Sequence, residues 1–200
     1  MPILRITLVV LLVTVGLIGS TIVVHLGWDE PFGRLTRDPT AVLKGPPYIG
    51  FLSQIGIFLW AGSAAICFLA AAVLNRASAG ARVWSFFLSA GALSLLLGID
   101  DAFLLHESVL PHFGLPEEAV VAGYAVLVGA WLVAYRQRLR ARDALLLMTA
   151  LVFFAISGLV DLVSPWQIGT LYEDSAKLAG LLFWLAYFAG AAMTALSDSR

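Results

Sequence analysis

The sequence has few charged residues and almost no cysteine. Only 12% of its 200 residues are Asp, Glu, Lys or Arg, whereas 60% are hydrophobic. Soluble globular domains contain about 25% charged residues, so this composition excludes a soluble domain and predicts a membrane protein. The single cysteine, Cys67, has no partner for an intramolecular disulfide and lies within an apolar run. We therefore expect it to be a small packing residue.

Two familiar hydrolase motifs are also absent. The sequence contains no His-x-x-x-His or His-Glu-x-x-His element and no Gly-x-Ser-x-Gly turn. Zinc-protease and serine-hydrolase mechanisms therefore lack the residues that they need.

The hydrophobic residues form long runs, each able to cross a membrane as a helix of about 20 residues. The first run is longer than the apolar region of a signal peptide and no Ala-x-Ala pattern follows it, so we expect a membrane helix there. We predict an all-α polytopic bundle of six transmembrane helices, with residues 1–200 forming a single integral membrane domain. The six predicted spans are about Ile6 to Leu26, Tyr48 to Leu74, Val83 to Leu105, Ala119 to Tyr135, Ala144 to Val163 and Ala176 to Leu196.

Arginines collect in the turn after the second span and in the turn after the fourth. Because basic turns stay in the cytoplasm, both turns and both chain ends are predicted to be cytoplasmic. We expect a multi-pass protein of a bacterial cytoplasmic membrane, with the lipid bilayer rather than nucleic acid as its partner. The arginines of these two turns are Arg76, Arg82, Arg136, Arg138, Arg140 and Arg142.

With this orientation, the acidic residues and the histidines lie mostly on the outer side. Every acid except Asp143 and Asp198 falls in an outer turn or at an outer helix end, as do His25, His106 and His112. For the acids in turns, the retention of arginines inside is a sufficient explanation. It does not explain acids that lie within a span.

The stretch Leu97–Glu107 places two adjacent acids, Asp100 and Asp101, within the third span and closes with His106 and Glu107. A helix that enters the membrane at the start of this span reaches Asp100 after about 25 Å, still inside a hydrocarbon layer of about 30 Å. Ionisable groups at such depth are costly unless they are paired or face a wet cavity, so they mark a candidate site.

A related pattern occurs in the fifth span. Gly98-Ile-Asp-Asp101 is followed later by Gly158-Leu-Val-Asp161, and both helices are predicted to run from inside to outside. Asp161 should therefore lie at a similar depth to Asp100. A duplicated helical hairpin and a chance similarity between two apolar helices are equal alternatives.

The sixth span is predicted to begin beside Glu173, Asp174 and Lys177. Glu173 and Lys177 are four residues apart, in the favourable order for a helical ion pair. Alternatively, Lys177 can neutralise Asp101 or Asp161 across helices, which would make the acids a satisfied internal network.

Two side chains on one helix bind the same ion when they are three or four residues apart. No pair among the acids and the histidine of Leu97–Glu107 has this spacing, so any metal ion must be shared between helices. A carboxylate-rich set favours Ca²⁺, Mg²⁺ or Mn²⁺ over Zn²⁺. The predicted ligands are Asp100, Asp101, Asp161, Glu173 and Asp174, the candidate catalytic residues are His106 and Glu107, and Lys177 and His25 are further candidate members of the site.

Two functional hypotheses follow. In the first, the outer-leaflet site binds a divalent cation or a cationic ligand, and an enzymatic version is a metal-assisted hydrolase of lipid or envelope material with His106 or Glu107 as general base. In the second, the protein is a structural or accessory subunit whose acids form an ion-pair network with Lys177. A conduit across the whole membrane is disfavoured, because the inner halves of the spans offer only a few hydroxyl groups.

The pattern Asp-Asp-x-x-x-x-His-Glu at Asp100–Glu107, combined with Glu-Asp-x-x-Lys at Glu173–Lys177, resembles a group of small bacterial polytopic membrane proteins of no assigned function. This resemblance covers roughly the last hundred residues, and it implies a fold and a location but no activity. Ceramidase-like membrane hydrolases are similar only as polytopic bundles with acids and histidines, since the histidine pairs that they require are missing here.

Overall fold

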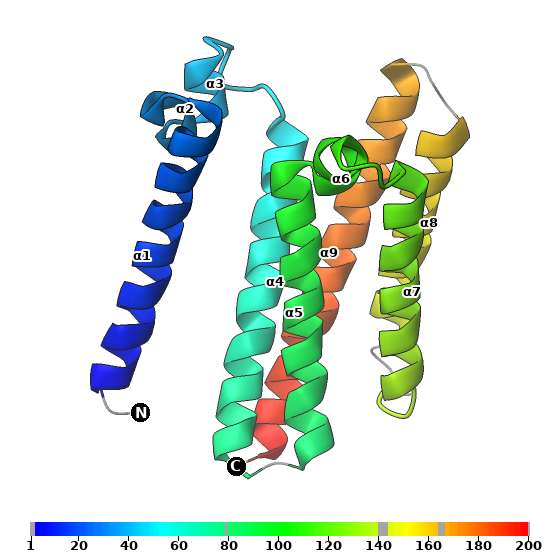
Figure 1. Cartoon of the computed structure of the whole chain (residues 1–200). Coiled ribbons are helices and arrows are strands. Elements are labelled where there is room, and N and C mark those ends of the chain that lie inside the picture. The colour runs from blue at the N-terminus through cyan, green and yellow to red at the C-terminus, as the bar shows by residue number, and fades with distance from the viewer. Residues whose placement is uncertain (1–2, 79, 140–143, 164–166, 200) are drawn as a thin grey trace. The chain divides into compact units, whose positions relative to one another are not determined.

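The computed structural model describes residues 3–78, 80–139, 144–163 and 167–199. Within these residues the regular structure is helical throughout, and six helices are long and apolar enough to cross a membrane (Figure 1). The predicted all-α fold is therefore confirmed. The chain divides into two compact units, residues 1–49 and residues 50–200. The six long helices are α1 (Ile3–Trp28), α4 (Phe51–Arg76), α5 (Ala81–Phe103), α7 (Glu117–Tyr135), α8 (Ala144–Val163) and α9 (Gln167–Asp198).

The first unit consists of α1 and two short helices, α2 (Phe32–Thr36) and α3 (Pro39–Val42). Pro39 is the first residue of α3, a position where proline is favoured because its fixed φ suits a helix and its missing N–H would have no partner. Nδ1 of His25 lies 2.7 Å from the carbonyl oxygen of Glu30. The segment between the first two spans is therefore folded rather than a plain connector.

The core of the second unit is built by two pairs of neighbouring helices, α4 with α5 and α8 with α9, and α4 also packs against α9. Aromatic rings fill the space between these helices. The indole of Trp184 lies 5.9 Å from Trp60 and 5.0 Å from Phe188, measured between ring centroids. The Trp184 indole also donates a 2.9 Å hydrogen bond to the hydroxyl of Ser94, so this buried polar group is satisfied.

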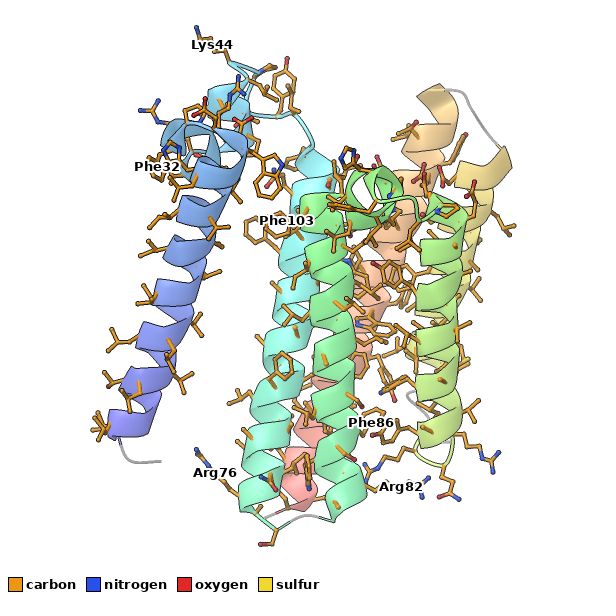
Figure 2. All side chains as sticks on the ribbon, viewed as in Figure 1. Phe32, Lys44, Arg76, Arg82, Phe86 and Phe103 are labelled. Atoms are coloured by element: carbon orange, nitrogen blue, oxygen red, sulfur yellow. The ribbon has the colours of Figure 1, made fainter. Side chains whose placement is uncertain are left out.

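Helix α7 is joined to α5 through long side chains. Nε1 of Trp131 donates to the Ser89 hydroxyl at 3.0 Å, and the Tyr135 hydroxyl donates to that of Ser85 at 3.3 Å. At the same end, Arg82 donates to the backbone of α7, and Phe86 lies on the side of α5 that faces α7 (Figure 2). Hydrogen bonds of this kind hold membrane helices together where the lipid offers no competing partner.

The helix boundaries match the predicted spans closely, with two informative differences. Helix α8 has the predicted bounds, but α9 begins at Gln167, before the predicted start at Ala176. Glu173 and Asp174 therefore lie in the second turn of a helix rather than at its first residues. The third span ends at Phe103 instead of Leu105, and this early end shapes the candidate site. Arg140, Arg142 and Asp143, which were assigned to the turn after the fourth span, lie outside the described residues.

Candidate functional site

Helix α5 ends because Leu104 adopts a left-handed conformation, with φ 52° and ψ 46°. This conformation costs a residue with a Cβ about 1–2 kcal/mol. The N–H of Leu104 bonds to the carbonyl of Asp100, and a π-helical turn over Leu105–Val109 follows. The chain thereby changes direction, and His106 is brought back over the last turn of α5. Local strain and π-helical turns both occur frequently at functional sites.

Asp100 is only 3% exposed and is surrounded by hydrogen-bond donors. Its Oδ1 accepts the backbone N–H of His106 at 2.9 Å and the hydroxyl of Tyr124 at 2.8 Å. Its Oδ2 accepts from Nδ1 of His106. Because Nδ1 is held by Asp100, the other ring nitrogen, Nε2, is directed toward Glu107, at 3.6 Å from its Oε1.

The hydrogen bond and the negative charge of Asp100 raise the pKa of His106 above its ordinary value, although burial acts in the opposite direction. Glu107 adds to the rise, whereas the positive charge of Lys177 opposes it. These contacts stabilise the imidazolium form that His106 takes after it accepts a proton. An oriented imidazole with one nitrogen engaged by a carboxylate is an arrangement that can accept and return a proton at the other nitrogen.

The side chain of Asp101 contacts other partners than that of Asp100 does. Nζ of Lys177 in α9 lies 2.6 Å from its Oδ1, and the indole N–H of Trp60 in α4 donates to its Oδ2 at 2.8 Å. Successive residues on an α-helix are about 100° apart around its axis, so two adjacent carboxylates cannot face the same neighbour. Asp100 thus holds α7 and the π-helical turn, while Asp101 holds α4 and α9.

A small pocket of about 90 Å³ opens beside this second group, between α4, α5, the π-helical turn and α9. Within the described residues, Lys177 is the one basic side chain of its lining, and Asp101 already engages it. Glu107 lies beside His106, whereas Glu173 and Asp174 take part in no ion pair in the described part of the chain. The charged residues of the lining are Asp101, Glu107, Glu173, Asp174 and Lys177, and the others are Leu52, Ser53, Gly56, Leu104, Leu178 and Leu181.

The structure thus brings together most of the residues that were predicted for the site, but not as one set. Asp100 faces His106 instead of the pocket, and Asp161 is exposed and does not line it. Across the described ranges, no three His, Cys, Asp or Glu side chains are placed to hold a metal ion together. The predicted shared metal centre stays a prediction, with no preformed ligand set to support it.

Of the two further candidate residues, Lys177 contacts an acid of the site, whereas His25 contacts residues of the first unit. Lys177 pairs with Asp101 across helices, as one alternative predicted, and in the part of the chain that the structure describes no ion pair joins it to Glu173. His25 belongs to the first unit, where it contacts Glu30 and stacks near Phe32 with ring centroids 4.1 Å apart. Its role in the site stays a prediction.

Two residues of the site, Trp60 and Tyr124, are not among those predicted from the sequence. Both carry a polar group at the tip of a large apolar ring, and such groups find a hydrogen-bond partner when they are buried. The presence of an indole N–H within the second span and a phenol within the fourth was therefore a usable signal. What it could not supply was the identity of the acceptors.

Six long apolar helices with ionisable groups paired inside the helical bundle define a multi-pass integral membrane protein. Residues 3–191 match a family described as a domain of unknown function (DUF8692), and the chain belongs to this family. The match agrees with the predicted resemblance to an uncharacterised group. Comparisons with curated proteins and with solved structures give no match.

Proposed function

We propose that the protein is a membrane-embedded binding protein whose acidic pocket takes a small cationic ligand. One observation carries this proposal: of the carboxylates that line the pocket, Glu173 and Asp174 take part in no ion pair among the described residues, and Lys177, the basic residue of the lining, is already paired with Asp101. A pocket with excess negative charge and low-dielectric walls concentrates cations. A single water molecule needs about 10–15 Å³ of such cavity space. The pocket, at about 90 Å³, therefore has room for one ammonium group or a hydrated ion.

An ammonium compound fits the pocket better than a bare metal ion does. Ca²⁺ needs 6–8 oxygen ligands at about 2.3–2.6 Å, and Mg²⁺ needs a near-octahedral set. No such convergence of acids exists among the described residues. An ammonium group is satisfied by two or three carboxylates at ordinary hydrogen-bond distance, a looser arrangement that Glu173, Asp174 and Glu107 can provide.

A hydrolytic version of this function would use His106 as its general base. Asp100 fixes the orientation of the ring through Nδ1 and leaves Nε2 directed toward Glu107, at the edge of the pocket. A cationic substrate held by the acids would then lie near a group that can accept a proton from water. Glu107 would act by holding the proton-accepting nitrogen in place and by stabilising its charged form.

The structural alternative has its own supporting observation. Asp101 connects three helices through Lys177 and Trp60, at 2.6 and 2.8 Å. No buried side-chain nitrogen or oxygen among the described residues lacks a partner, so the network is fully satisfied. If the pocket binds no cation, the acids and Lys177 serve to fix the helices relative to each other.

Calorimetric titration of the purified protein in detergent distinguishes these functions. The probes are methylammonium chloride and, separately, the chlorides of Ca²⁺, Mg²⁺, Mn²⁺ and Zn²⁺. We expect binding of methylammonium that becomes at least tenfold weaker in Glu173→Gln, since one carboxylate contact contributes about 1.4 kcal/mol or more. Glu118→Gln is the matched control, because this acid is exposed and lies outside the pocket lining, and its affinity should equal that of the wild type.

Two results would contradict the proposal. Absence of heat with every probe would leave only the structural function. Binding of a divalent ion alone, weakened equally by Glu173→Gln and Asp161→Asn, would instead support the metal centre shared between helices.

A further inference from the structure

A second pocket, of about 160 Å³, lies at the opposite end of the second unit. It is bounded by Phe86 and Phe87 near the start of α5, by Arg138 just after α7 and by the last turns of α9. Phe86 and Asp101 are fifteen residues apart on one helix, which corresponds to a separation of about 22 Å along its axis. This pocket is therefore separate from the acidic pocket, and the proposed binding of a cationic ligand does not involve it.

The pocket contains two opposite charges that do not neutralise each other. Arg138 lies on one side and Asp198, the last residue of α9, on the other. Among the residues that the structure describes, neither side chain takes part in an ion pair. A ligand that carries both an anionic and a cationic group would satisfy both side chains at once.

The remaining lining is apolar with a polar edge. Phe86 and Phe87 are buried behind the pocket, and the partly exposed side chains of Ala191 and Ala195 supply apolar surface at its wall. Thr194 adds a hydroxyl that already donates to the carbonyl of Gly190 at 3.1 Å, so its oxygen can act as an acceptor. The pocket thus combines one phosphate-type anchor, one ammonium-type anchor and a surface for hydrocarbon.

The position of the pocket indicates where the ligand comes from. It lies where α7 and α9 both end and where Arg82 also lies, next to Phe86 at the same end of α5 (Figure 2). Helix ends and arginines mark the boundary between the hydrocarbon layer and the headgroups. A pocket between membrane helices at this level is within reach of lipid headgroups.

We propose that this pocket binds the headgroup of a zwitterionic phospholipid, with the phosphate on Arg138 and the ammonium group on Asp198. The planar guanidinium group matches a phosphate with two parallel hydrogen bonds, which an ammonium side chain cannot do. Asp198 disfavours a purely anionic headgroup, because an unmatched carboxylate beside a phosphate is repulsive. A primary ammonium group, as in phosphatidylethanolamine, can donate to both Asp198 and the Thr194 oxygen.

Native mass spectrometry of the detergent-solubilised protein tests this assignment. The probes are phosphatidylethanolamine and phosphatidylglycerol with identical acyl chains, together with free phosphoethanolamine. We expect the wild type to bind phosphatidylethanolamine at least fivefold more tightly than phosphatidylglycerol. We expect free phosphoethanolamine to bind at least a hundredfold more weakly, because it lacks the chains that pack against the helices.

Three variants test the residues. Arg138→Gln should weaken both lipids about tenfold, and Asp198→Asn should abolish the preference between them while retaining binding. Arg136→Gln removes an arginine of the same turn that does not line the pocket, and it should leave affinity and preference unchanged. If Arg138→Gln does not fold, Arg138→Lys keeps the charge without the bidentate geometry and should still weaken both lipids severalfold.

The proposal is overturned if the wild type binds the two lipids equally. It is also overturned if Arg136→Gln and Arg138→Gln reduce binding to the same extent, which would indicate general attraction to basic residues. Equal affinity for free phosphoethanolamine would show that the ligand is a soluble zwitterion rather than a lipid. None of these results depends on the acidic pocket, and Glu173→Gln should leave lipid preference unaltered.

Discussion

Asp100 and His106 are six residues apart, yet two hydrogen bonds join the histidine to the aspartate. The backbone N–H of His106 lies 2.9 Å from Oδ1, and the imidazole Nδ1 reaches Oδ2. A continuous α-helix would place these residues on different faces, with about 9 Å of rise between them. The left-handed conformation of Leu104 removes this separation. The pair is thus a product of the helix break.

The stability of the protein should fall as the pH rises through the pKa of His106. The hydrogen bond that His106 donates to Asp100 raises the folded-state pKa of His106 above 6.5, the ordinary value that the unfolded chain would have. The stabilisation is therefore fully present below about pH 6.5 and is lost as the pH passes the higher, folded-state value. We expect a loss of about 1–3 kcal/mol, typical of a hydrogen bond between charged groups, measured by thermal unfolding in detergent across this range.

The control for this pH dependence is His106→Gln, which cannot titrate. Its unfolding midpoint should be lower than that of the wild type at acidic pH and should change less with pH. An unaltered pH profile in this variant would assign the titration to another group. Histidine ring shifts in an NMR titration would identify the group directly.

Asp101 and Lys177 should be strongly coupled in a double-mutant cycle. Lys177→Met leaves a largely buried carboxylate without its cation, and Asp101→Asn leaves an ammonium group without its anion, so each should cost about 3–5 kcal/mol. The double variant should cost less than the sum, with a coupling energy of about 1–3 kcal/mol in thermal unfolding. Strict additivity would show that the 2.6 Å contact contributes nothing to the network.

A substitution at Leu104 should be able to increase the stability of the protein. Asparagine tolerates the left-handed region better than leucine, so Leu104→Asn should stabilise the protein by about 0.5–1 kcal/mol despite the loss of some apolar contact. Leu104→Val should destabilise it by more than 1 kcal/mol, because a β-branched residue is least compatible with positive φ. The measurement is the thermal midpoint, and the reverse order of the two variants would contradict the role assigned to this residue.

Two glycines of the repeated pattern should respond differently to alanine. A Cβ added at Gly98 would lie 2.8 Å from Cβ of Trp60, whose indole is held by Asp101. For a Cβ added at Gly158, the described residues place no atom within 4 Å, apart from the helix's own neighbouring backbone. Gly98→Ala should therefore cost about 1–3 kcal/mol. Gly158→Ala should be neutral or stabilising by up to about 1 kcal/mol, because alanine favours the helix.

Equal effects of these two substitutions would contradict the difference in packing. The measurement is again thermal unfolding in detergent, with the amount of folded protein after purification as a second readout. The result bears on the predicted duplication, because a functional repeat would need both glycines to serve the same purpose. Their present surroundings differ, and the duplication stays a prediction.

The positions of the spans could be predicted because the bilayer imposes them. A backbone in hydrocarbon must satisfy its hydrogen bonds internally, so an apolar run of sufficient length has no alternative to a helix. Helix α8 has the predicted bounds. Helix α9 is longer than its predicted span. The charged residues Glu173, Asp174 and Lys177 interrupt the apolar run, but in the folded chain they line a pocket and the helix continues through them.

The sequence by itself determined that this chain forms long apolar helices and that acids, a lysine and a histidine lie near the ends of three of them. Only the tertiary structure decided their pairing. Neighbouring carboxylates on a helix face different directions, and Leu104 has no intrinsic preference for the conformation that turns His106 back toward Asp100. Hydrogen-bond partners depend on such breaks and on the rotation of each packed helix, and neither is encoded in hydropathy.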